Sequence, residues 1–248
     1  MNTASQLQGA TALASDGEAG RIKDIYFDDE HWTVRYLVVE TGGWFDSREV
    51  LVSPLAVTGT DGPNGRVNLN ISKEQIRNAP EIDTRKPVSR QQETSFADYY
   101  RYPYYWGGAW TWGFMGYPGT QPDGPAGEPS RAVGNGQAAR EREQGDPHLR
   151  SCKQLTGYEI RATDDSVGHV EDFVIDERNW AIKLIVVDTR NWWPGKKVLI
   201  APDRIDRVSW DDKQIVVNNT RAEIQRSPDY DRAKLEPQPD RASATERI

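Results

Sequence analysis

The sequence holds few of the residues that most often perform chemistry. Its 248 positions include one cysteine and three histidines. A single cysteine, Cys152, excludes an intrachain disulfide and fits a reducing compartment. His148 lies shortly before it, but a zinc site would need further ligands at a compatible spacing. We therefore expect no catalytic residue, no cofactor and no metal site.

Long apolar runs and dense basic clusters are missing too. Aliphatic runs such as 184–187 are far shorter than the roughly 18–20 residues that span a bilayer. Residues 1–20 lack the basic and apolar regions of a secretory signal. The formal charge is −7, and no segment concentrates the lysines and arginines that phosphate neutralisation requires. These absences predict a cytoplasmic protein without a transmembrane segment and disfavour nucleic acid as a direct partner, while peripheral membrane association stays open.

An internal repeat is the strongest feature of what is present. A shift of 148 positions aligns residues 9–83 with 157–231 without a gap, at about 18 identities over about 75 positions. A repeat of this length indicates two whole domains, because solenoid units have only about 20–50 residues. Glycine, proline and tryptophan all keep this register, as shown by the pairs Gly20/Gly168, Trp32/Trp180, Trp44/Trp192, Pro54/Pro202 and Pro80/Pro228.

Each repeat has the pattern of a small, mainly antiparallel sheet followed by one helix. Residues 22–28 alternate between two faces, which is typical of a half-buried strand. β-Branched and aromatic residues dominate 32–41, and a third strand is expected over 49–52. A weaker strand is expected over 66–70. The helix begins at a capping box in both copies, formed by Ser72 with Gln75 and by Thr220 with Glu223.

These motifs resemble the PRC-barrel family. The resemblance rests on the strand motif of 20–28 and 168–176, the tryptophan-led strand of 32–41 and 180–189, the tryptophan turn and the strand that ends at proline. The family includes the cytoplasmic domain of the photosynthetic reaction centre H subunit and the C-terminal domain of the ribosome maturation factor. The resemblance implies an all-β protein of two small barrels, each with a short C-terminal helix. It also implies protein-binding or assembly modules without shared catalytic residues.

The segment between the repeats has no counterpart in either. We expect a first barrel over 1–84, a largely disordered linker over 85–150, a second barrel over 151–231 and a disordered tail over 232–248. The first part of the linker is dense in tyrosine, tryptophan and glycine, and 118–145 is rich in proline, glycine and charge. Each barrel is expected to fold on its own.

The aromatic residues have two interpretations. They lie on the surface of one barrel, or they bind a partner or a second copy, because exposed aromatic groups are costly unless covered. Stacking on nucleic-acid bases is disfavoured by the near-neutral charge of this segment. The candidate interaction residues are Trp44, Trp192, Trp193, Tyr99, Tyr100, Tyr102, Tyr104, Tyr105, Trp106, Trp110, Trp112 and Phe114.

The polar candidates are the repeated acids Asp24/Asp172 and Asp28/Asp176. Aspartates at strand ends accept backbone hydrogen bonds in the following turn, and the alternatives are a glycosidase-like pair or a calcium site. His31 is replaced by Asn179 and His169 by Arg21 in the other copy, so a role common to both repeats cannot rest on either histidine.

The sequence thus predicts a non-enzymatic interaction or assembly module with a protein partner or a second copy of itself. The resemblance to the reaction centre H subunit suggests association with a membrane complex. Two alternatives remain: binding of RNA or a ribosomal protein during ribosome maturation, and hydrolase activity in an unfamiliar barrel.

Overall fold

The computed structural model describes residues 1–42, 47–61, 65–84, 86–105, 148–189, 196–227 and 230. The first repeat contains β1 (Asn2–Thr3), α1 (Ala4–Leu7), β2 (Thr11–Ala14), β3 (Gly17–Asp28), β4 (Thr33–Thr41), β5 (Arg48–Val52), η1 (Pro54–Ala56), β6 (Val57–Asp61), β7 (Arg66–Leu69) and α2 (Lys73–Arg77). The helix α3 (Arg90–Tyr100) follows. The second repeat contains β8 (Leu149–Ser151), α5 (Cys152–Leu155), β9 (Glu159–Arg161), β10 (Ser166–Asp176), β11 (Ala181–Asp188), β12 (Lys197–Ile200), η3 (Pro202–Arg204), β13 (Ile205–Ser209), β14 (Gln214–Val217) and α6 (Arg221–Gln225).

The expected fold class is confirmed. The described residues form mostly strands, and neighbouring strands are antiparallel apart from the pairs β2 with β7 and β14 with β9. The two short helices α2 and α6 begin at the predicted capping boxes of Ser72 and Thr220. Among the described residues, no helix is both long and apolar enough to cross a membrane.

A glycine in each repeat permits the close approach of two strands. Gly20 and Gly168 have φ angles of +154° and +152°. A Cβ atom at Gly20 would lie 2.1 Å from the carbonyl oxygen of Glu40, and one at Gly168 would lie 2.0 Å from that of Asp188. Only glycine fits both the backbone conformation and the space, which explains why this residue keeps its place in both copies.

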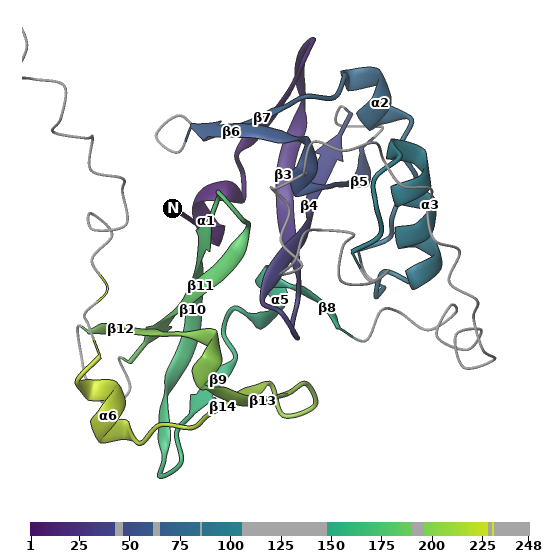
Figure 1. The fold of residues 1–248 in the computed structure, drawn as a ribbon. Helices are drawn as coiled ribbons and strands as arrows, with labels where there is room; N and C mark the ends of the chain where they lie inside the picture. Colours follow the sequence, from purple (N-terminus) through teal and green to yellow (C-terminus); the bar gives the residue numbers. More distant parts are fainter. Residues whose placement is uncertain are drawn as a thin grey trace, which may run out of the picture.

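The two repeats exchange their N-terminal strands. β1 of the first repeat pairs with β10 of the second, placing Thr3 opposite Val174. Reciprocally, β8 of the second repeat pairs with β3 of the first, placing Ser151 opposite Tyr26. Figure 1 shows α1 beside β10 and β11, and β8 at the end of the first repeat's sheet. The repeats are therefore interlocked in an approximately two-fold arrangement.

The repeated aspartates of the long strands hold the exchanged segments. Oδ1 of Asp24 accepts hydrogen bonds from the backbone N–H of Ile25 at 2.7 Å and of Lys153 at 3.2 Å, and Ser151 Oγ donates to its Oδ2 at 2.5 Å. In the other repeat, Asp172 Oδ1 accepts from the backbone N–H of Ser5 at 3.0 Å, and the Ser5 hydroxyl donates to Asp172 Oδ2. Each aspartate thus binds the first turn of the other repeat's helix, where a carboxylate is favourable.

One apolar core runs through both repeats. Residues from β3, β4, β10 and β11 belong to a single buried cluster. The rings of Phe27 and Phe173 meet across it with centroids 5.9 Å apart. The Val34 N–H donates to the Trp180 carbonyl at 2.8 Å, and the Ile182 N–H donates to the Trp32 carbonyl at 2.7 Å. This shared core gives a physical reason to doubt that either repeat folds alone.

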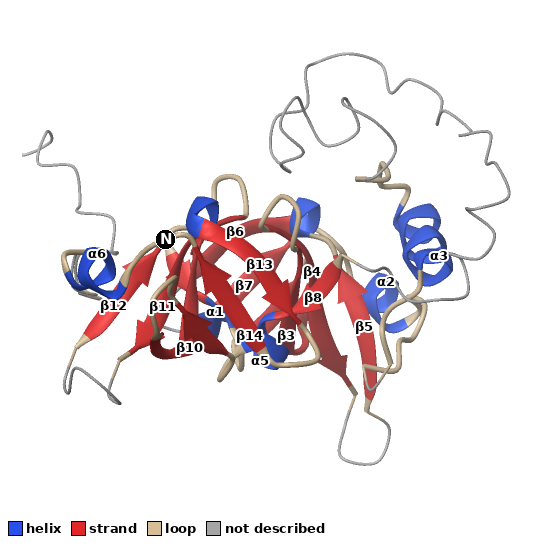
Figure 2. Ribbon diagram, turned by 90° about the horizontal axis from the view of Figure 1, so that it is seen from below, coloured by secondary structure: helices blue, strands red, loops and turns tan. Residues whose placement is uncertain are grey.

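Two ordered elements come from the region expected to be a linker. β8 pairs within the sheet, and α3 begins at a capping box formed by Ser89 and Gln92. α3 lies on the flank of the first repeat, beside α2 and β5 (Figure 2). Phe96 of α3 is buried and packs edge-on against Tyr36 with centroids 5.1 Å apart. A largely disordered linker was expected over these residues, and packing on the first repeat stabilises the helix instead.

Candidate functional site

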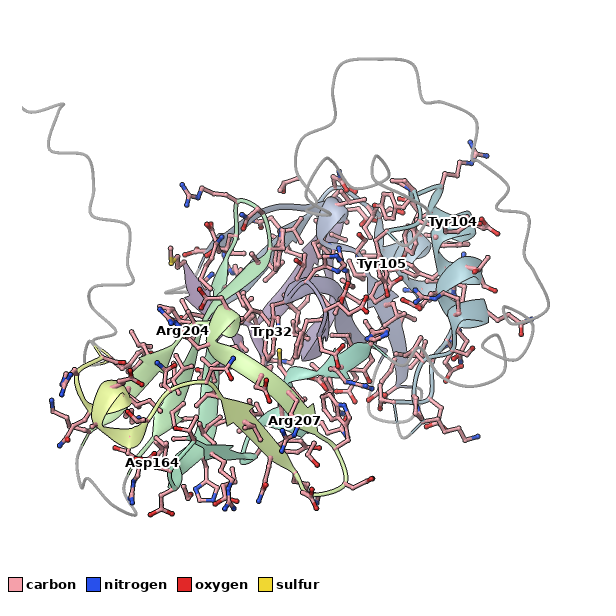
Figure 3. The ribbon with its side chains drawn as sticks, turned by 60° about the horizontal axis from the view of Figure 1, so that its bottom comes forward. Trp32, Tyr104, Tyr105, Asp164, Arg204 and Arg207 are labelled. Atoms are coloured by element: carbon pink, nitrogen blue, oxygen red, sulfur yellow. The ribbon has the colours of Figure 1, made fainter. Side chains whose placement is uncertain are left out.

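A groove of about 730 Å³ opens where the two repeats meet. Its walls are the turn between β3 and β4 with the start of β8 on one side, and β11, η3 and β13 on the other. Figure 3 shows Trp32 where the repeats meet and Arg207 on the second repeat. The apolar lining residues are Trp32, Ala181, Ile182, Ala201, Pro202, Ile205, Val208 and Trp210, and the polar ones are Asp29, Glu30, His31, His148, Arg150, Lys183, Asp203, Asp206 and Arg207.

The turn between β3 and β4 is shaped by Asp28. Its Oδ1 accepts hydrogen bonds from the backbone N–H of Glu30 at 2.8 Å and of His31 at 3.2 Å. Trp32 then adopts a left-handed backbone with φ of 51°, as Trp180 does in the other copy with φ of 58°. The turn presents Glu30 and His31 to solvent and keeps Trp32 buried at the repeat junction.

Arg150 joins the two sides of the groove. Its Nε donates to Asp29 Oδ2 at 2.9 Å, and its guanidinium lies 3.9 Å from the ring centroid of Trp210. Trp210 also packs against Tyr158, with ring centroids 5.9 Å apart. A charged group held between a carboxylate and an aromatic face is fixed in orientation. The groove therefore has one rigid, charged end.

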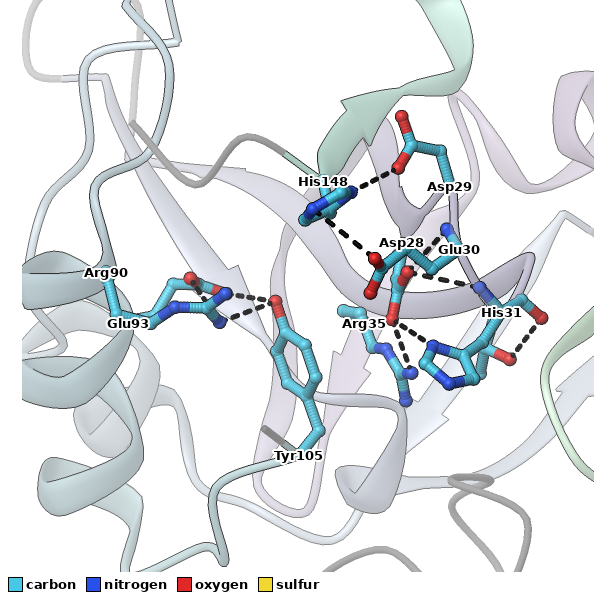
Figure 4. A network of polar contacts seen from close by, with 10 residues as sticks. Asp28, Asp29, Glu30, His31, Arg35, Arg90, Glu93, Tyr105 and His148 are labelled. Carbon is cyan, nitrogen blue, oxygen red and sulfur yellow. Dashed lines mark hydrogen bonds and ion pairs between the residues drawn. The ribbon is translucent and has the colours of Figure 1, made fainter. Parts of the chain in front are cut away.

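A buried polar network lies behind the groove in the first repeat (Figure 4). Arg35 is 1% exposed and donates to Asp28 Oδ2 at 2.8 Å. The Tyr105 ring covers its guanidinium, with the centroid 4.4 Å away. The Tyr105 hydroxyl donates to Glu93 Oε1 at 2.6 Å, and Arg90 lies 3.1 Å from the other oxygen of Glu93. The network connects α3 to the β3–β4 turn.

The electrostatic environment of the repeated acids differs between positions. Burial raises the pKa of Asp24, and hydrogen bonds from Ser151 and backbone N–H groups only partly oppose it. Burial opposes the ionisation of Asp28, but the Arg35 guanidinium together with hydrogen bonds from Glu30 and His31 lowers the pKa of that carboxyl overall. Hydrogen bonding from Arg178 lowers the pKa of Asp176. These carboxylates accept hydrogen bonds from the fold itself, as the turn interpretation expects.

The remaining groups considered for chemistry lie apart from each other. Cys152 is fully buried, and burial raises the pKa of its thiol well above the ordinary value. A thiol in this setting is a weak nucleophile. His169 is exposed on β10 of the second repeat. His31 and His148, in contrast, both line the groove.

The aromatic candidates fall into two sets. Of the described ones, Tyr99 is 38% exposed and donates to the Gln75 carbonyl at 2.8 Å, while Tyr100 and Tyr102 stack on each other and on the core. Tyr104 donates to Asp98, which raises its pKa to about 12. Tyr105 covers Arg35. Their packing on the first repeat fits the surface interpretation, and their role in binding stays a prediction. Trp44, Trp192, Trp193, Trp106, Trp110, Trp112 and Phe114 lie outside the described residues.

Two of the groove residues, Arg150 and Trp210, were not predicted from the sequence. Trp210 has Gly62 as its counterpart and Arg150 has Asn2, so the repeat register gives no signal for either. The one available sign was a tryptophan in a polar turn, Ser209 to Asp212, where exposure would be costly. His148 and Asp29 lie 119 positions apart, and only the strand exchange brings them together.

Comparisons with known proteins agree with the fold. The model of the PRC-barrel domain matches residues 1–76 and 147–224. An uncharacterized protein from Deinococcus radiodurans is 34% identical over 74 residues, which is 29% of this chain and 26% of that protein. The chain thus spans about a quarter of the length of that relative. Because the domain model matches more than half of the chain, in two regions that correspond to the two repeats, this protein belongs to the PRC-barrel family.

Proposed function

We propose that this protein is a non-enzymatic binding module that takes an extended segment of a partner protein into the groove between its repeats. This proposal depends mainly on β13, because four of its consecutive residues, Ile205 to Val208, line the groove. In the described part of the chain β13 pairs with β14 alone. A strand with one unpaired edge can accept a further strand through main-chain hydrogen bonds.

The composition of the groove supports a peptide more than a nucleic acid. An apolar floor with Trp32 and Trp210 suits side chains that anchor a peptide in a pocket. The rim carries both signs of charge, with Asp203 and Asp206 near Arg207 and Lys183. A surface that neutralises phosphates would instead carry a basic excess. Mixed charge fits a partner segment that alternates apolar and polar residues.

The equivalent strand of the first repeat, β6, makes polar contacts at the position that corresponds to the apolar groove floor. The counterpart of Val208 is Thr60, whose Oγ1 accepts a hydrogen bond from Asn2 Nδ2 at 2.9 Å and also contacts Glu177. These polar contacts hold β6 against the exchanged N-terminal segment. The binding stoichiometry is therefore expected to be one peptide per chain.

Panning a displayed peptide library against the full chain tests this proposal. The selected peptides should compete for one site with a 1:1 stoichiometry in calorimetry. A Val208→Asp variant places a charge on the groove floor and should weaken binding by at least tenfold. The matched control is Thr58→Asp, an exposed residue of β6 whose counterpart in the second repeat is Asp206. Peptides that bind both variants equally would contradict the proposal.

A further inference from the structure

We infer that Glu30 and His148 make the groove selective for a partner segment that carries a lysine or arginine, and that proton uptake by His148 weakens this selection. The inference rests on the proposed binding of an extended segment in the groove, and it adds the charge of that segment and its dependence on pH. Both residues line the groove and are open to solvent, with 57% of the Glu30 side chain and 45% of the His148 side chain exposed.

The backbone fixes His148 beside the turn between β3 and β4. The Asp29 N–H donates to the His148 carbonyl at 3.0 Å, next to the pairing of β8 with β3. The His148 ring then lies between two carboxylates of the turn. Its Nδ1 is 3.0 Å from Asp29 Oδ1, and its Nε2 is 3.4 Å from Glu30 Oε1 (Figure 4). Each ring nitrogen therefore faces a carboxylate.

This placement ties the contact with Glu30 to the protonation state of His148. A neutral imidazole has one N–H group and one lone pair, whereas the charged imidazolium has two N–H groups. When the neutral ring donates its Nδ1–H to Asp29, the lone pair of Nε2 faces the Glu30 oxygen and offers it no hydrogen. The charged ring attracts both carboxylates. Proton uptake thus joins Glu30 to His148, and proton loss releases Glu30.

The other acidic groups around the ring are already close to arginines. Asp29 accepts a hydrogen bond from Arg150 Nε at 2.9 Å. The other ion pairs of the turn and of the opposite wall are Asp28 with Arg35 and His31, Asp203 with Arg204, and Asp206 with Arg207. Lys183 is the remaining charged residue of the groove lining. In the described part of the chain, Glu30 forms an ion pair with His148 alone.

A released Glu30 carboxylate at the edge of an apolar floor favours a cationic side chain in the partner. A lysine or arginine can pack its alkyl chain on the apolar lining, which includes Trp32 and Ile182, while its charged group reaches Glu30. An acidic residue at the same point would meet a like charge, which is unfavourable. The groove should therefore discriminate by charge at this end, and most strongly when His148 is neutral.

Panning a displayed peptide library against the full chain at pH 8 and at pH 6 tests the inference, because imidazoles commonly change charge in this range. At pH 8 the selected peptides should be enriched in lysine or arginine at one position, and the enrichment should fall at pH 6. In calorimetry a selected basic peptide should bind about two- to fivefold more tightly at pH 8 than at pH 6, the range expected of a partly exposed ion pair. Binding at intermediate pH should release protons to the buffer.

Two variants assign the effect to these residues. His148→Gln cannot take up the proton, so the affinity of the basic peptide should be equal at pH 6 and pH 8. Glu30→Gln should lower the affinity at pH 8 about two- to fivefold and abolish the preference for a basic residue. The matched controls are His169→Gln, an exposed histidine of β10, and Glu18→Gln, an exposed acid of β3 away from the groove. Both controls should behave like the unmodified chain.

The altered side chains are partly exposed, so the variants are expected to fold, and circular dichroism checks this. Peptides that Val208→Asp still weakens, but that show no basic preference or bind equally at pH 6 and pH 8, would overturn the inference and leave the proposed peptide site intact. A pH dependence that persists in His148→Gln would also overturn it. If no peptide is selected at either pH, the proposed function fails and the inference fails with it.

Discussion

The two repeats share the residues that determine their backbone conformation, and they differ in the residues that cover the outer face of each sheet. Both keep the glycine at the strand crossing, the left-handed tryptophan, the aspartate that holds the exchanged helix, and the capping box. The outer face of the first repeat is covered by Val88 and Phe96 and by tyrosines that follow them. In the second repeat Leu184 and Leu199, the counterparts of Tyr36 and Leu51, are only half-buried.

This difference separates two kinds of constraint. Gly20/Gly168 at the strand crossing and Asp24/Asp172 at the exchanged segments are the same in both copies. Both repeats contribute to one shared core, which explains why these positions are constrained alike. Positions at the turn tips have diverged, and His31 and Arg35 stand where the second repeat has Asn179 and Lys183. The rest of the first repeat's buried network comes from α3 and the residues after it, which have no counterpart in the second repeat. Equivalent substitutions in the two repeats can therefore test which positions stabilise both repeats alike and which stabilise only one.

The largest difference is expected at the aspartates of the β3–β4 and β10–β11 turns. Asp28→Asn leaves the buried Arg35 without its carboxylate and should lower the free energy of unfolding by about 4 kcal/mol. Asp176→Asn should lower it several-fold less, because its partner Arg178 is exposed and screened by solvent. Chemical denaturation at pH 7 measures both. Equal losses would show that the first repeat's network carries no extra stability.

The same pair has a defined pH dependence. The pKa of Asp28 is lowered in the folded state, so its stabilising contribution is present above the unfolded pKa of about 3.9 and is lost as the pH falls through the folded pKa. The stability gap between the unmodified chain and Asp28→Asn should therefore shrink below about pH 4. A gap that stays constant from pH 7 to acid would contradict the Arg35 assignment.

A smaller difference is expected between the outer faces. Phe96→Ala removes a buried ring that contacts Tyr36 and Tyr100 and should cost about 3 kcal/mol. Leu199→Ala removes a half-buried side chain at the uncovered face and should cost about 1 kcal/mol. Thermal unfolding of both variants checks the order. A larger loss for Leu199→Ala would mean that its face is as well packed as that of the first repeat.

The two glycines at the strand crossings should respond alike to substitution. Gly20→Ala and Gly168→Ala each force a Cβ against a backbone carbonyl and should cost about 2 kcal/mol. The expected difference between the two variants is the smallest of all the pairs. If one is tolerated and the other unfolds the protein, the two repeats do not share the same strand crossing.

Much of the fold could be predicted from the sequence, because its signals are local. Alternation in the long strands and the capping boxes at Ser72 and Thr220 depend on residues close in the chain, and repetition at one register strengthens each. The short strands β1 and β8 carry no such signal. Two or three residues have no measurable period, and nothing local shows that they pair with the other repeat.

The site was harder to predict for a related reason. His148 meets Asp29 and Glu30 of the β3–β4 turn only through the strand exchange. Comparison of the repeats argued against His31 because Asn179 replaces it, and His148 was considered only together with Cys152. Asp24 was recognised as a repeated acid, yet its partners Ser151 and Lys153 lie in the other copy. Alignment of the two repeats identifies the residues that both contain, whereas the groove is lined largely by residues that differ between the repeats or lie outside them.

The strand exchange and the shared core join the two repeats into one interlocked unit. Residues 1–105 and 148–230 can be produced separately and together, then examined by light scattering after gel filtration and by amide NMR spectra. Each half alone should fail to form a folded monomer, because its exchanged strand and half of its core are missing, and the mixture should give a 1:1 complex with a dispersed spectrum. Two halves that are each folded and monomeric alone would contradict the claim.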